Sequence, residues 1–152
     1  MNAPIASISK RTGALVHAYL ILRKTDQVLL QLRQNTGYCD GQWSFAAGKV
    51  EDNEPASSAM IREAQEELGI GLAASDLKVA HVMHRKTNQF NIDVFFECSR
   101  WDGKLENKEA HKCAEMRFFP LIALPSPLVD YNQTALDFIA KGIVYSELGW
   151  DR

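Results

Sequence analysis

The sequence predicts an α+β protein, an αβα sandwich in which a mixed sheet carries helices on both faces. Strand-like runs come first along the chain, a helix follows, then more strands and a second helix. The chain has 152 residues with 46% hydrophobic content, enough for one domain with a real core. Sheets and helices bury their apolar sides as layers. We therefore expect a flexible leader at residues 1–12 and one domain over residues 13–152.

Composition excludes several classes of protein. The formal net charge is −2, which argues against a partner as long and acidic as a nucleic acid, whereas small anionic substrates remain open. The longest apolar run, residues 14–22, is far shorter than the roughly 20 residues of a membrane span. The leader has no apolar segment typical of a signal peptide. We expect a cytoplasmic protein that does not enter membranes.

The three cysteines predict no disulfide framework. Cys39, Cys98 and Cys113 are odd in number and form no closely spaced pair, so we expect reduced thiols that pack. His111 lies two residues before Cys113, but this pair lacks the four-ligand spacing of structural zinc.

The first two strands are predicted at residues 14–22 and 28–33, with a hairpin turn at 24–27. Nearly every residue of both runs is apolar, which indicates burial on two faces. His17 lies inside the first run, where a histidine is more often a core residue with satisfied hydrogen bonds than a catalyst. A short strand at 43–46 follows a loop.

A helix is predicted at residues 55–68. Pro55 suits the first helical position, and Gly69 suits the position just past the end. At helical spacing, one side carries Met60, Ile61, Ala64 and Leu68, and we expect this side to pack.

Three carboxylates lie on the other side of this helix. Glu63, Glu66 and Glu67 crowd near its C-terminal end, the negative pole of the helix dipole, and only Arg62 offers local relief. A divalent cation would neutralise them, and carboxylate oxygens suit Mg²⁺ or Mn²⁺. The alternative is an amphipathic surface helix whose acidic face is simply solvated.

Such a cation also indicates a chemistry. Mg²⁺ held by carboxylates usually takes its remaining ligands from substrate phosphates, so a diphosphate group could bind beside this helix. The metal also makes water acidic enough to attack phosphorus near neutral pH. The expected reaction is hydrolysis of a phosphoanhydride.

Residues 48–70 resemble the Nudix box of the Nudix hydrolases. The residues that carry the resemblance are Gly48, Glu54, Arg62, Glu63, Glu66, Glu67 and Gly69. Seven identities at this spacing would coincide by chance with a probability on the order of 10⁻⁸. The resemblance implies the Nudix αβα sandwich and hydrolysis of a nucleoside diphosphate linked to another moiety, with Mg²⁺ or Mn²⁺ as cofactor.

The sequence departs from the common box at two places, neither of them a carboxylate. Ala64 is small where the family usually has a bulky apolar residue, and residues 46–47 are alanines where Pro-Gly is commoner. The family uses the main-chain carbonyl just before the box glycine as a metal ligand. Ala47 can still supply it.

The resemblance also implies roles for the box residues. Glu63, Glu66 and Glu67 match metal-binding and base positions, with Ala47 as a further metal ligand. Arg62 and Glu54 match an ion pair that holds the loop on the helix, and they are structural together with Gly48 and Gly69.

Family members often add a carboxylate from a remote loop. Glu109 is our first candidate for this group and Glu115 the second, although either acid could be an ordinary surface residue.

Two more strands are predicted at residues 77–86 and 91–98, joined by a turn at 87–89. In the first, His81, Met83 and Arg85 alternate with Val82 and His84, so one face is polar. A further strand at 116–119 stops at Pro120. A helix follows at 131–141 and ends at Gly142, with apolar residues at helical spacing. The aromatic tail at 145–150 could serve a homodimer interface as easily as a core.

Substrate contacts are expected from the polar strand face and the flanking loops. The candidates are Arg85, His84, Phe90, Tyr38 and Asn132. In the family, a proline about fifteen residues beyond the box is associated with ADP-ribose specialists, and none is present here. A small nucleotide, most simply a modified nucleoside triphosphate, is therefore the favoured substrate.

Other readings stay open. A nucleotide sugar or a dinucleoside polyphosphate could be the substrate instead. The chain could also be a Nudix-fold sensor that binds a nucleotide without hydrolysing it, or a scaffold whose acidic helix binds nothing.

Overall fold

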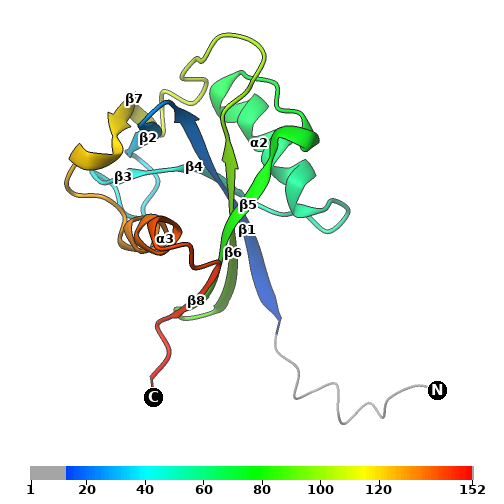
Figure 1. Ribbon diagram of the computed structural model, residues 1–152, viewed down its shortest axis with the longest axis vertical. Helices are drawn as coiled ribbons and strands as arrows, with labels where there is room; N and C mark the ends of the chain where they lie inside the picture. Colours follow the sequence, from blue (N-terminus) through cyan, green and yellow to red (C-terminus); the bar gives the residue numbers. More distant parts are fainter. Residues whose placement is uncertain (1–12, 152) are drawn as a thin grey trace.

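The computed structural model describes residues 13–151 (Figure 1). The predicted leader at residues 1–12 lies outside the described residues. Two α-helices are present in the described part, α2 (Ala56–Leu68) and α3 (Asp130–Ala140), with short 3₁₀ helices at Ala74–Asp76 and Leu121–Ala123. The strands are β1 (Ala14–Lys24), β2 (Gln27–Arg33), β3 (Trp43–Ser44), β4 (Ala46–Lys49), β5 (Lys78–Lys86), β6 (Phe90–Cys98), β7 (Cys113–Pro120) and β8 (Tyr145–Leu148).

The sheet is mixed, as predicted. Its strand order is β3-β2-β1-β6-β5-β8, with β4 added to β1 and β7 added to β2. The β1–β6 and β5–β8 pairs are parallel, and the other pairs are antiparallel. Strand β1 is central because it pairs along its length with β6 and β4 and at its end with β2.

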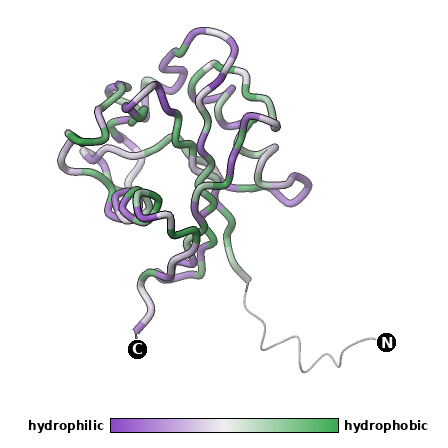
Figure 2. Tube along the Cα trace, in the orientation of Figure 1, coloured by the Kyte–Doolittle hydropathy of each residue, from purple (hydrophilic) through white to green (hydrophobic). Residues whose placement is uncertain are grey.

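The two helices cover opposite sides of the central strands (Figure 1). Alternate residues of a strand point to opposite faces, and β1 supplies both layers. Ala18 and Leu20 pack in the core that includes α2, whereas Tyr19 and Ile21 pack in the core that includes α3. Figure 2 shows the apolar character concentrated along these strands. The predicted burial of β1 on two faces and the predicted αβα layers are confirmed.

Helix α2 differs from the prediction in two details. Pro55 is the N-cap with extended backbone (φ −74°, ψ 163°), one position before the predicted one. Ala59 is buried although it was not among the predicted packing residues, whereas Ile61 is partly buried and packs against the core as predicted. Gly69 ends the helix as expected: its φ of 68° is left-handed, and its N–H donates to the carbonyl of Gln65.

The structure adds detail to three further predictions. Residues 43–46 form parts of two strands, β3 and β4, because β3 pairs with β2 whereas β4 pairs with β1. The aromatic tail includes β8, which extends the sheet beside β5. The predicted polar face of β5 is buried, since His81, Met83 and Arg85 are at most 7% exposed. Ring nitrogens of His81 bond the carbonyl of Ile143 and the hydroxyl of Ser146 at 2.8 and 2.7 Å.

The cysteines pack, as predicted, without disulfide bonds in the described residues. Cys98 and Cys113 are buried, and their thiols donate to the carbonyls of Arg100 and Glu115. Burial raises the pKa of both thiols, which keeps them in the unreactive protonated form. Neither α2 nor α3 is long and apolar enough to cross a membrane.

Candidate functional site

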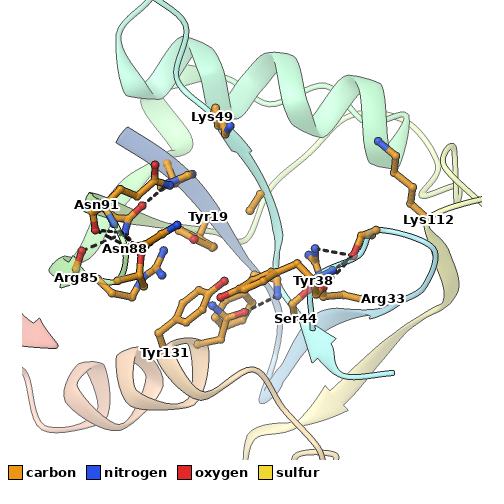
Figure 3. Close-up of a pocket in the computed structure, with 17 residues that line it drawn as sticks. Tyr19, Arg33, Tyr38, Ser44, Lys49, Arg85, Asn88, Asn91, Lys112 and Tyr131 are labelled. Carbon is orange, nitrogen blue, oxygen red and sulfur yellow. Dashed lines mark hydrogen bonds between the residues drawn. The ribbon is translucent and has the colours of Figure 1, made fainter. Parts of the chain in front are cut away.

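Two cavities adjoin at strand β4. The first, of about 570 Å³, is lined by Glu63, Glu66 and Glu67 of α2 and by Glu109 of the loop before β7. We call it the acidic cavity. The second, of about 810 Å³, lies on the α3 side and is lined by three tyrosines, Tyr19, Tyr38 and Tyr131, among other residues (Figure 3). We call it the tyrosine cavity.

The border between the cavities is basic. Six residues line both of them: Arg33, Thr36, Ser44, Ala47, Lys49 and Lys112. Arg33 ends β2, Lys49 ends β4 and Lys112 precedes β7, so three separate segments bring their charges to one place. In Figure 3, Lys49 lies on the opposite side of the cavity from Tyr131. A polyanion lying across this border would meet cations from three directions.

Gly48 allows strand β4 to pass close over α2. A Cβ atom at Gly48 would lie 2.1 Å from Cδ of Glu63, a separation that real atoms do not adopt. The Glu67 carboxylate accepts a hydrogen bond from the backbone of the neighbouring Ala47. Strand and helix are thus held in contact where the carboxylates gather.

Glu67 is a buried carboxylate with one unused oxygen. Its Oε2 has no hydrogen-bond partner among the described residues. Burial raises the pKa of Glu67 to about 8, and the charges of Glu63 and Glu109 add to the rise. The pKa of Glu63 is also raised, chiefly by burial. The protein's own groups therefore do not fully stabilise the ionised forms of these two carboxylates.

Arg62 is the main counter-charge. Its guanidinium donates to Glu54 at 2.6 Å, to Glu63 at 2.9 Å and to Glu66 at 3.4 Å. It also donates to the carbonyl of Lys49 at 3.2 Å. The hydrogen bond from Arg62 lowers the pKa of Glu54 below its ordinary value. The structure thus contains the Arg62–Glu54 pair, and this pair ties the loop before α2 to the helix.

The cluster offers a divalent cation several oxygen ligands, but their present arrangement is not that of a metal site. As the side chains stand, no group of three or more His, Cys, Asp or Glu within residues 13–151 is arranged to hold a metal ion. Glu63 and Glu66 instead contact Arg62. However, Glu67 keeps a buried carboxylate oxygen without a partner in the described residues, and a carboxylate oxygen is a suitable ligand for a hard divalent cation. The acids and the Ala47 carbonyl suit Mg²⁺ or Mn²⁺.

The structure separates the two candidates for the remote carboxylate. Glu109 lines the acidic cavity, and its charge contributes to the raised pKa of Glu67. Its carbonyl accepts N–H bonds from Lys112 and Cys113 at 2.8 and 2.9 Å, which fold the loop. Glu115 lies on β7, pairs with Arg117 at 3.1 Å and does not line the cavity. Of the two candidates, only Glu109 lines the acidic cavity.

The tyrosine cavity contains a buried ion pair. Arg85 donates from Nε and Nη2 to the two carboxylate oxygens of Asp93, which is fully buried. The Arg85 guanidinium also lies 4.0 Å from the ring centre of Tyr131. Tyr19 stacks on Phe95 at 4.6 Å, and burial raises the pKa of Tyr19. This wall of the cavity is rigid and nearly neutral.

Asn132, on α3, is a buried amide residue that also lines the tyrosine cavity. Its Oδ1 accepts the N–H of Phe45 at 3.0 Å, which orients the amide. Its Nδ2 is buried without a partner in the part of the chain that the structure describes. Asn132 is among the residues that line the cavity, and its N–H₂ group is a hydrogen-bond donor that the described residues leave unpaired.

Two of the predicted substrate contacts lie elsewhere. Arg85, Tyr38 and Asn132 line the tyrosine cavity, but His84 and Phe90 do not. Those two rings pack on Trp150, with centroid distances of 4.7 and 5.4 Å. His84 follows Met83 and precedes Arg85 on β5, so strand alternation turns it to the other face.

Sequence reasoning missed the basic border. Arg33 organises the loop after β2 by donating to the carbonyl of Tyr38 at 2.8 Å and to the hydroxyl of Thr36 at 3.2 Å. Lys49 directly follows Gly48 within the box, and this position was the one signal in the sequence that could have indicated a role in the site. Lys112 reaches the border from a loop that has no local pattern.

Comparison with known proteins adds the family. The model of the NUDIX domain matches residues 12–141. The 8-oxo-dGTP diphosphatase of Proteus vulgaris is 32% identical over 94 residues, which are 62% of this chain and 83% of that protein. The CTP pyrophosphohydrolase of Escherichia coli (strain K12) is 36% identical over 61 residues, 40% of this chain and 45% of that protein.

Solved structures share the fold. A MutT NUDIX hydrolase from Burkholderia pseudomallei superposes with a TM-score of 0.75 at 24% identity, covering 82% of this chain and 97% of that one. The E. coli ORF135 protein superposes with a TM-score of 0.73 at 24% identity, covering 91% and 94%. The predicted fold class is thus confirmed.

Proposed function

Since the chain belongs to the NUDIX domain family and is a pyrophosphohydrolase, we propose that it hydrolyses a nucleoside triphosphate, a modified one included, in a reaction that requires a divalent metal. The observation that carries this proposal is the basic border between the two cavities. Arg33, Lys49 and Lys112 line both cavities. A nucleotide has matching parts in the same order: metal-bound phosphates, then a pentose and a base.

The acidic cavity would hold the metal. Glu63, Glu66, Glu67 and the Ala47 carbonyl would be its ligands, and the bound ion would neutralise phosphate charge and make water a better nucleophile. Lys49 and Arg33 would bind phosphate oxygens from the border, which keeps the phosphoanhydride beside the carboxylates. The charges of these cations also balance the negative charge that grows on the leaving phosphate.

Glu109 is our candidate for the group that accepts a proton from water. Glu109 lines the acidic cavity, and hydrogen bonds from Lys112 and Cys113 to its main-chain carbonyl fix the backbone of its loop. As the oxygen of water attacks phosphorus, Glu109 would accept the water proton, and the bond to the bridging oxygen would break with its electron pair on the leaving phosphate. Glu115 does not line the acidic cavity and is not proposed for this role.

The base would enter the tyrosine cavity. Asn132 offers a buried donor, which favours a base with an acceptor at that point, and Tyr38 and Tyr131 supply aromatic surface. Two relatives are named for triphosphate substrates, 8-oxo-dGTP and CTP. These names support the triphosphate over a nucleotide sugar or a dinucleoside polyphosphate, without selecting a base.

A substrate screen tests the proposal. The full chain would be incubated with Mg²⁺ and a panel of nucleoside triphosphates, 8-oxo-dGTP included, nucleotide sugars and dinucleoside polyphosphates. Products from ¹⁸O-water would be identified by mass, which locates the attacked phosphorus. We expect a triphosphate to be cleaved best and only with metal present. Binding without turnover would support a sensor instead.

The Glu109 assignment has a matched control on the next segment. Glu109→Gln should lower kcat by about 10²-fold, because the general base is lost. Glu115→Gln removes a similar charge a few residues away and should leave kcat within about twofold of wild type. Equal effects of the two substitutions would contradict the assignment.

A homodimer remains part of the proposal. Residues Val144 and Tyr145 at and beside strand β8 are 69% and 50% exposed, which leaves apolar surface at this end of the sheet. Analytical ultracentrifugation of the full chain would decide between monomer and dimer.

A further inference from the structure

His17 is a histidine of the tyrosine cavity that the proposed reaction does not use. It lies on β1, lines the cavity and is half-buried. The structure gives it one hydrogen bond, from Nε2 to Oδ1 of Asn91 at 3.1 Å. Nothing in residues 13–151 bonds its other ring nitrogen, Nδ1, and this nitrogen is therefore available to a ligand.

Asn91 fixes which nitrogen of His17 carries the proton. The Asn91 amide nitrogen donates to the carbonyls of Arg85 and Gln89 at 3.1 and 3.2 Å. Carbonyl oxygens only accept, so the amide cannot be flipped, and its Oδ1 must face His17. His17 must then donate from Nε2. In the neutral ring Nδ1 carries a lone pair, and it is a hydrogen-bond acceptor.

The surroundings keep the ring neutral. Burial lowers the pKa of His17, and the charges of Arg85 and Lys49 act in the same direction, while the bond to Asn91 and the charge of Asp93 oppose it. The cavity therefore offers two fixed polar groups of opposite character, a donor at Asn132 and an acceptor at His17. The charged and titratable groups around the ring on β1, β4, β5 and β6 are Lys49, Arg85, Asp93 and Tyr19.

Position identifies the part of the nucleotide that His17 would meet. His17 is the direct register partner of Lys49 in the β1–β4 pair. Lys49 belongs to the basic border, where the proposed function places the phosphates. The pentose is the part of a nucleotide attached to the phosphate, and its hydroxyl groups are donors. Figure 3 shows Asn91, the partner of His17, on the same side of the cavity as Lys49 and away from Tyr131.

We propose that Nδ1 of His17 accepts a hydrogen bond from a pentose hydroxyl of the bound nucleotide. His17 is then a specificity residue for the sugar, and Asn91 is its positioning residue. This inference rests on the proposed function for the placement of the phosphates. The proposed contact requires one hydroxyl donor on the ligand, at the 2′ or the 3′ position of the pentose.

Product-like ligands test the proposal without turnover. The probes are GMP and CMP with their 2′-deoxy, 3′-deoxy and 2′,3′-dideoxy forms, and binding to the full chain is measured by calorimetry. Loss of the correct hydroxyl should weaken binding about three- to tenfold, as for one neutral hydrogen bond. The pair of monodeoxy probes shows whether the 2′ or the 3′ hydroxyl is read. Equal affinity for the ribose and dideoxy forms would overturn the proposal.

His17→Phe keeps the ring shape and removes the acceptor. In this variant the ribose and dideoxy forms should bind equally, with affinities near that of the dideoxy form for wild type. Val16→Ala on the opposite face of β1 is the matched control, and it should keep the wild-type ratio between the two forms. A histidine with a purely structural role would weaken all probes by one factor, and an unchanged ratio in His17→Phe would refute the proposal.

The binding test also separates the two proposals. If wild type discriminates the hydroxyl but cleaves no triphosphate, the sugar assignment stands and the proposed reaction fails. If wild type cleaves a triphosphate at equal kcat/KM with and without both hydroxyls, the reaction stands and the sugar assignment fails. Should His17→Phe not melt cooperatively, the deoxy probes on wild type still decide.

Discussion

The two cavities treat buried charge in opposite ways. In the tyrosine cavity, Arg85 and Asp93 neutralise each other through two hydrogen bonds. In the acidic cavity, Arg62 shares its charge among Glu54, Glu63 and Glu66, and Glu67 keeps a buried oxygen with no partner. Burial of unpaired charge is costly. The charges of one cavity are therefore paired within the protein, whereas the carboxylates of the other are only partly paired.

This difference in charge pairing indicates different roles for the two cavities. A satisfied ion pair rigidifies its surroundings, which suits a wall that shapes a base and a sugar. An unsatisfied carboxylate cluster binds whatever neutralises it, which suits a metal and the phosphates that follow it. Substitutions of the Arg85–Asp93 pair should therefore act mainly on stability, and substitutions of the carboxylates in the acidic cavity mainly on turnover.

Breaking the complete pair should have the largest effect. Asp93→Asn leaves the Arg85 charge buried and unpaired, and we expect the free energy of unfolding to fall by about 3 to 5 kcal/mol in denaturant titrations. Removing both charges, in Arg85→Leu with Asp93→Leu, should recover much of the loss. If Asp93→Asn unfolded like wild type, the pair would not be the structural element that we describe.

Glu67→Gln should separate turnover from stability. We expect kcat to fall by about 10²-fold or more, or about 2.7 kcal/mol in activation free energy, with cooperative melting retained. Glu106→Gln on an exposed loop is the control and should leave kcat unchanged. Full activity of Glu67→Gln on the substrate found in the screen would show that the carboxylates have other roles.

The contact between β4 and α2 can be disrupted by adding one methyl group at Gly48. Gly48→Ala places a methyl group 2.1 Å from Cδ of Glu63, so the strand or the carboxylate must move. We expect a loss of about 1 to 3 kcal/mol in stability, together with weaker Mn²⁺ binding. Gly13→Ala is the control, because a Cβ there meets nothing within 4 Å. If both alanine variants kept wild-type Mn²⁺ affinity, close passage over Glu63 would not matter for the metal.

The most gradual effect is on the pH dependence of stability in the metal-free protein, because it is spread over several pH units. Folding raises the pKa of Glu67 to about 8, so in the interval between its ordinary value and this one the folded state holds a proton that the unfolded state has lost. Stability should therefore fall as pH rises through this interval, by at most about 1.4 kcal/mol per pH unit. Glu63, whose pKa is also raised, adds a decline of the same sign.

Thermal melts in a chelating buffer measure this decline. Glu67→Gln should have a flatter profile than wild type, and saturating Mg²⁺ should stabilise wild type more at high pH than at low pH. Identical slopes for the two proteins would contradict the buried state of Glu67.

Local patterns predicted the elements better than their contacts. Helix α2 could be predicted from its apolar spacing and its ends, with an error of one position at Pro55. Strand β8 escaped prediction because Tyr145–Leu148 is short, and its place beside β5 depends on a parallel pairing across about 60 residues.

The site residues also fall into those that local patterns could predict and those that depend on distant contacts. The three box glutamates could be found because a helix places them together by its own geometry. Arg33, Lys49 and Lys112 could not, since their meeting depends on the register of β1, β2 and β4 and on the path of a loop. His84 and Arg85 were both expected at the substrate, although neighbours on a strand face opposite sides. His17 was expected in the core, yet it lines the cavity.

The most direct test of the central claim is a calorimetric titration of the full chain with Mn²⁺, compared with the same titration of Glu67→Gln. If Glu63, Glu66 and Glu67 hold a divalent cation, wild type should bind Mn²⁺ well below the millimolar range with a defined stoichiometry, and the variant should lose most of that affinity. Millimolar binding that is equal in the two proteins is the behaviour of a solvated acidic surface, and it would contradict the account.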